Sequence, residues 1–132
     1  MKSTFFMMMK IPTVTAQEKQ INKKTGTLYS PGKVEDVKEK YLAHLDKYKP
    51  QRLFYPPVSL RVCFMFHSDK VEQPTPKITK PDTDNMLKLL KDCMTIKNFW
   101  KDDAHVTIEQ ISKYWVPGPE GILIEVEEVK ST

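Results

Sequence analysis

Four aspartates, divided between the two ends of one short segment, are the residues of this sequence best suited to chemistry. Residues 80–103 read KPDTDNMLKLLKDCMTIKNFWKDD. Asp82 and Asp84 stand one residue apart where the pattern predicts the start of a helix, and Asp102 and Asp103 follow that helix. Proteins bind Mg²⁺ through a few carboxylates, together with water and substrate phosphate. The pattern therefore indicates a divalent-metal site for phosphodiester hydrolysis.

The predicted helix would have to bring these acids together. Asp82 and Asp84 straddle its first residue, so their oxygens can converge on one ion, and the positive end of the helix dipole favours negative charge there. A reversing connection after a short helix would return Asp102 or Asp103 to the same point. Lys88 lies one helical turn after Asp84 and adds a cation beside the acids.

A purely structural explanation of the same residues also fits the pattern. Asp82 could cap the helix, and Asp84 could be a first-turn acid that pairs with Lys88 four residues later. Asp102 and Asp103 could belong to a solvated turn. The residues alone leave both explanations open.

Two other uses of an Asp-x-Asp pattern fit poorly. An aspartyl-phosphate phosphatase places its nucleophile at the end of an apolar strand, whereas residues 77–81 are polar and contain proline. A nucleotide-sugar transferase would use the pair with manganese, but this chain is short for that class and shows no recognisable nucleotide fold. We therefore expect no nucleotide cofactor.

Composition describes an ordinary soluble protein. The chain has 132 residues, of which 39% are hydrophobic and 29% charged, so we expect one compact domain over residues 1–132. The net charge of +4 permits a polyanionic partner. The apolar run at residues 5–9 is too short for a signal peptide or a membrane span. We expect a cytoplasmic protein whose cysteines, Cys63 and Cys93, are reduced and buried.

Hydrophobic periodicity predicts an α/β domain with a mixed sheet packed against two main helices. Strands are expected at Thr4–Ile11, Val58–Phe66, from Val106 onward, and at Ile122–Val126. Helices are expected from Pro31 to about Tyr48 and over Thr83–Thr95. Val106 and Ile108 should share a face, with a bulge near residues 110–111. The connections carry lysines that could contact DNA phosphates: Lys19, Lys23, Lys24, Lys77 and Lys80.

The longer pattern resembles a known family. Lys-Pro-Asp-x-Asp-Asn at residues 80–85, followed by Lys88 and by Phe-Trp-x-Asp-Asp at residues 99–103, is similar to the RusA family of Holliday junction resolvases. The resemblance implies a homodimeric, Mg²⁺-dependent endonuclease that cuts four-way branched DNA in recombination and repair, with Mn²⁺ as a possible substitute. Lys80-Pro81 stands where some members have arginines, which puts junction affinity and cleavage preference in doubt.

The resemblance also assigns roles to individual residues. Asp82, Asp84 and Asp103 match the metal-binding catalytic acids, and Asp102 matches a neighbouring acid that could join them at the metal. Lys88 matches a lysine that assists catalysis by neutralising charge or orienting phosphate. Two alternatives remain open: a catalytically inactive protein that binds branched DNA, and a metal nuclease that acts on flaps or other DNA forms.

Overall fold

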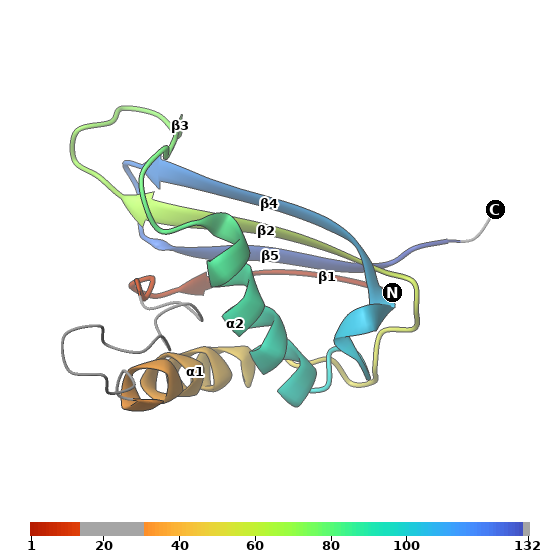
Figure 1. The fold of residues 1–132 in the computed structure, drawn as a ribbon. Helices are drawn as coiled ribbons and strands as arrows, with labels where there is room; N and C mark the ends of the chain where they lie inside the picture. Colours follow the sequence, from red (N-terminus) through yellow and green to blue (C-terminus); the bar gives the residue numbers. More distant parts are fainter. Residues whose placement is uncertain (14–30, 131–132) are drawn as a thin grey trace.

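The fold is a five-stranded mixed sheet with two helices on one face (Figure 1). The computed structural model describes residues 1–13 and 31–130. The α/β class and the mixed sheet expected from the periodicity are confirmed. The strands, in the sheet order β1-β5-β2-β4-β3, are β1 (Lys2–Met8), β5 (Gly121–Glu128), β2 (Val58–His67), β4 (Val106–Val116) and β3 (Thr75–Pro76).

The parallel pairing of β2 with β4 decides where the connecting helix runs. The other neighbouring strands of the sheet pair antiparallel. A parallel pair needs a connection that travels back along the sheet, and a helix usually supplies it. Here α2 (Thr83–Ile96) makes that return, so it starts near the end of β2 and finishes near the beginning of β4 (Figure 1). A 3₁₀ helix, η2 (Asp103–His105), then leads into β4.

The helices cover the apolar face of the sheet. On α1 (Pro31–Leu45), Val34, Val37, Tyr41 and Leu45 are buried at helical spacing, as predicted. On α2 the buried stripe contains the residues expected from the sequence, together with one more: Met86, Leu87, Leu89, Leu90, Cys93 and Met94. These side chains pack against the alternating buried residues of β2 and β5, which forms a single core.

Two details of the predicted strands are wrong. The first strand was expected to reach Ile11, but β1 ends at Met8, because its partner there, Gly121, is the first residue of β5. Beyond the end of β1, Ile11 remains bonded to the residue before β5, since its amide donates to Glu120 Oε2 at 2.7 Å.

The irregularity in β4 lies earlier than predicted. Val58 pairs with Val106 but Ser59 pairs with Ile108, so Thr107 is the extra residue of the bulge. Val106 is therefore buried beneath the helices, whereas Ile108 is half exposed on the opposite face. The following residue, Glu109, pairs with the core residue Leu60 and points toward α2. The bulge thus reverses the facing that simple alternation had predicted.

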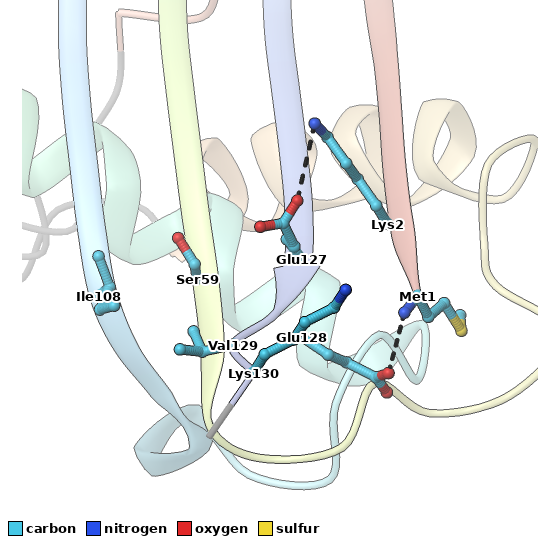
Figure 2. Close-up of a pocket in the computed structure, with 8 residues that line it drawn as sticks. All are labelled: Met1, Lys2, Ser59, Ile108, Glu127, Glu128, Val129 and Lys130. Carbon is cyan, nitrogen blue, oxygen red and sulfur yellow. Dashed lines mark hydrogen bonds and ion pairs between the residues drawn. The ribbon is translucent and has the colours of Figure 1, made fainter. Parts of the chain in front are cut away.

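The second face of the sheet carries no helix in the part of the chain that the structure describes (Figure 1). Figure 2 shows one row of this face, in which Lys2, Glu127, Ser59 and Ile108 lie side by side across four strands. The row lines an open hollow of 580 Å³, and Lys2 Nζ lies 3.6 Å from Glu127. This hollow is on the opposite side of the sheet from α2 and its acids.

Glu128 joins three parts of the chain at the end of β5. Its carboxylate accepts bonds from Arg52 at 2.7 and 3.2 Å and from the Tyr55 amide at 2.7 Å. It also accepts a bond from the Met1 ammonium at 3.1 Å, which Figure 2 shows. The Arg52 bonds, followed by the bond from Tyr55, lower the pKa of Glu128 to about 2. One side chain thus ties the connection before β2 to the end of β5 and to the start of β1.

Replacing Gly121 with alanine should destabilise the fold by about 1–3 kcal/mol, because a well-packed region must deform to admit the methyl group. A Cβ at this position would lie 2.4 Å from Phe6 Cζ and 2.5 Å from the Met7 carbonyl oxygen. Gly118→Ala is the matched control, since its Cβ would meet no atom within 4 Å. Urea unfolding measures both variants, and equal midpoints would contradict the close packing of β1 on β5.

Glu128→Gln should lower stability at neutral pH, and the difference from the parent should shrink in acid. Because the pKa of folded Glu128 lies below its ordinary value of 4.5, its contribution is complete above about pH 4.5 and is lost as the pH falls toward about 2. Unfolding midpoints measured from pH 7 to pH 2 test this. Glu127→Gln, which removes a looser contact with Lys2, should show a smaller pH-dependent difference.

Candidate active site along helix α2

The first pair of acids is exposed at the N-terminal end of α2. Asp82 occupies the N-cap position, but its side chain makes no capping hydrogen bond, and its nearest cation is Lys80 at 3.9 Å. Asp84 accepts a hydrogen bond from the Asn85 amide at 3.0 Å. Among the described residues, neither Asp84 nor Lys88 forms an ion pair, so the structure contains neither a helix cap from the Asp82 side chain nor an ion pair between Asp84 and Lys88. Both carboxylates are therefore available to a ligand.

The second pair of acids lies at the other end of α2. The Thr95 hydroxyl donates to Asp103 Oδ1, and the buried Trp100 indole N–H donates to the Thr95 hydroxyl at 2.7 Å. The indole also lies 3.4 Å from Asp103 Oδ1. Asp102 caps η2 by accepting from the Ala104 amide at 2.8 Å. Asp103 is thus anchored to the core, whereas Asp102 has a local structural role.

A groove connects the two ends. One face of α2 and two helix-facing residues of β4 line a hollow of 270 Å³, and Asp103 closes it. Lys91 bridges the groove by pairing with Glu109 at 2.8 Å, and both side chains are more than half buried. The remaining wall residues of α2 are Asp84, Leu87, Lys88 and Asp92. The groove therefore places an exposed lysine, Lys88, between acids.

The expected return of Asp102 or Asp103 to the beginning of the helix is wrong. Asp103 contacts Thr95, and eleven residues at the rise of an α-helix place Thr95 about 16 Å along the axis from Asp84. Within residues 1–13 and 31–130, no three His, Cys, Asp or Glu side chains are close enough to hold one ion. The metal roles of Asp82, Asp84, Asp103 and Asp102 stay predictions, but a single chain does not assemble all of them.

The lysines predicted to contact DNA occupy different surroundings. Lys80 is exposed beside Asp82 and can reach a phosphate there. Lys77 is buried, with its ammonium 4.0 Å from the centre of the Trp115 ring, so its side chain is turned into the protein. Lys19, Lys23 and Lys24 lie outside the described residues. Contact between DNA and any of the five predicted lysines stays a prediction.

Comparison with models of known protein families identifies the family to which this chain belongs. The family model described as endodeoxyribonuclease RusA matches residues 10–127. The chain belongs to the RusA family. The match runs through both acid pairs and the groove, and it covers β2, β3, β4 and all of β5 but its last residue, whereas β1 lies before its first matched residue. RusA membership makes endodeoxyribonuclease activity the expected activity of this chain.

A search of curated proteins found no match. In addition, no helix among the described residues has the length and apolar character needed to cross a membrane.

The pattern of the sequence did not single out Glu109 or Thr95, which the structure places around the predicted acids. Glu109 reads as an ordinary polar strand position, and only the bulge at Thr107 directs it toward Lys91. Thr95 reads as the last polar residue of a helix, yet its hydroxyl fixes Asp103 in this RusA chain. A usable signal was present for Trp100, since a buried indole needs a hydrogen-bond acceptor nearby.

Thr95→Val should destabilise the protein by about 1–3 kcal/mol, because it leaves the buried Trp100 N–H with only the longer contact to Asp103. Thr95→Ser keeps the hydroxyl and should retain most of this stability. Denaturant unfolding, followed by tryptophan fluorescence, compares the two variants. Unchanged stability in Thr95→Val, or a larger loss in Thr95→Ser, which lacks only the methyl group, would contradict the stabilising role of the hydroxyl.

Proposed function

We propose that this chain is a magnesium-dependent endodeoxyribonuclease that resolves Holliday junctions by paired cuts in opposing strands. The observation that carries the proposal is the family match over residues 10–127, which includes every acid of the α2 groove. Exposure of Asp82 and Asp84 at the start of α2 supports it, because neither carboxylate is enclosed by the protein and both can reach an external cation.

Asp82 and Asp84 are the acids best placed to hold the metal ion. Mg²⁺ is commonly bound by one or two carboxylates, with substrate phosphate and water completing its shell. The pair at the start of α2 satisfies that requirement, although the full set of predicted acids does not assemble in one chain. A bound divalent ion would lower the pKa of a water molecule and stabilise negative charge on the phosphate.

Lysines around the groove would position the DNA backbone. Lys88 stands one turn after Asp84, exposed and without an ion-pair partner among the described residues, so its ammonium is free to contact a phosphate. Lys80 offers a second exposed cation beside Asp82. Lys91 differs because Glu109 already neutralises it. Binding through such contacts releases counterions and should weaken steeply as salt rises.

A homodimer would match the symmetry of the substrate and would bring together acid pairs that lie at opposite ends of α2 in one chain. A four-way junction has approximate twofold symmetry, and a twofold dimer would present two identical α2 grooves to it. Within one chain the acid pairs lie at opposite ends of α2, and DNA phosphates or a second copy would complete the shell of an ion held at either end. Paired cleavage would follow from two equivalent sites on one dimer.

Asp82→Asn and Asp84→Asn should each reduce cleavage of a synthetic four-way junction by at least about 100-fold, because each removes a carboxylate ligand. Junction binding should persist, since the lysines remain. Cleavage rates with Mg²⁺, and with Mn²⁺ as substitute, together with gel-shift affinities, measure both effects. Asp36→Asn, an identical change on the exposed surface of α1, serves as the control. Unimpaired cleavage by either site variant would contradict the proposed role of that aspartate as a metal ligand.

The substrate is tested by comparing cleavage of a four-way junction, a flap and a linear duplex of matched sequence. Preferential, paired nicking of the junction supports resolution. Faster cleavage of the flap would instead establish a nuclease for other branched forms. Binding of the junction without nicking of any substrate, at any concentration of Mg²⁺ or Mn²⁺, would identify a non-catalytic branched-DNA-binding protein.

A further inference from the structure

The segment that delivers Asp82 to the site has almost no apolar anchorage. Between β3 and α2 the chain runs from Lys77 to Pro81, and Ile78 is 92% exposed while Thr79 and Lys80 are also exposed. Pro81 is the buried residue nearest to Asp82. Hydrophobic packing alone therefore leaves most of this segment free, and some other interaction must fix the direction in which α2 begins.

Lys113 supplies that interaction from β4. Its ammonium donates to the Thr79 carbonyl at 2.5 Å and to the Pro81 carbonyl at 2.8 Å. The Pro81 carbonyl belongs to the peptide group that continues into Asp82, so this bond acts on the residue directly before the first acid. Lys113 forms no ion pair among the described residues, and its acceptors are neutral carbonyls. The Lys113 ammonium therefore fixes the backbone of residues 79–81 and does not neutralise a carboxylate.

Lys77 secures the other end of the same segment. Its ammonium lies 4.0 Å from the centre of the Trp115 ring and 5.1 Å from that of Phe66, and it donates to the Thr79 hydroxyl at 2.6 Å. Its amide donates to the Lys113 carbonyl at 3.1 Å, which pairs the segment with β4. Burial, and then the nearby Lys113 charge, lower the pKa of Lys77.

We propose that Lys113 is a positioning residue for the Asp82–Asp84 end of the site. By joining two carbonyls that flank Lys80, it fixes the chain where it enters α2 and hence the directions of both carboxylates. Lys77 holds the start of the segment so that Lys113 can hold its end. The inference rests on the proposed function for its consequence in catalysis, whereas the fixing of residues 79–85 is a property of the fold.

The test uses the full chain with Lys113→Met, which keeps a long side chain but has no donor, and Lys113→Arg, which keeps several donors. Lys113→Gln is a second loss variant, because a short neutral amide cannot span both carbonyls. Lys40→Met, on the exposed surface of α1, controls for the lost charge. Each protein is examined by urea unfolding, by amide hydrogen exchange, by Mn²⁺ binding without DNA, and by junction cleavage at saturating and limiting substrate.

The expected result is a local one. In Lys113→Met and Lys113→Gln, amide exchange should accelerate over residues 79–86 while the sheet stays protected, and Mn²⁺ affinity should fall. The value of kcat should drop by about tenfold to a hundredfold with KM little changed, because misplaced groups still bind but react poorly. Lys113→Arg should restore most of kcat, and Lys40→Met should match the parent.

Other outcomes overturn the proposal. Unchanged exchange over residues 79–86 in both loss variants would show that Lys113 does not fix the segment. Exchange that rises equally throughout the sheet, with kcat falling only in proportion to the unfolded fraction, would show a general stabilising role. If the parent chain cleaves no junction, the proposed function fails. Amide exchange over residues 79–86 and Mn²⁺ affinity then still test whether Lys113 fixes the segment before α2.

Discussion

The parallel pairing of β2 with β4 is the constraint on which the rest of the site depends. Two parallel neighbours cannot be joined by a tight turn, so the chain must travel back along the sheet before β4 can begin. Helix α2 forms this return connection, and its length sets the distance between the acids before its first turn and the acids after its last turn. The acids flank α2, and the topology therefore separates them into two pairs.

The residues of the two motifs divide into those that anchor and those that remain exposed. Phe99 and Trp100 are fully buried, and they hold the end of the α2 connection against the core. Asp103 extends from this anchored segment, and its partial burial is offset by donors from Thr95 and Trp100. Asp82 and Asp84 have no such enclosure, but the helix N-terminus favours their charge.

Positive charge in this protein serves structure as well as any anionic partner. Lys91 neutralises Glu109 across the groove, Lys113 holds carbonyls, and Lys77 lies on an aromatic ring. Arg52 organises the opposite end of the sheet through Glu128. The basic composition is therefore a poor guide to DNA contacts, because several of the cations are already engaged. Lys80 and Lys88 are exposed and stay candidates.

The sequence by itself determined the two main helices, four of the strands and most of the core, because hydrophobic periodicity is a local property. The α2 stripe and the alternation of β2 could be read directly, and the motifs marked the acids. Only the tertiary structure decided that Asp103 lies by Thr95 rather than by Asp84, that Thr107 turns Glu109 inward, and that Lys77 is buried. Each of these depends on pairing between distant segments, and local pattern carries no information about which strand lies beside which.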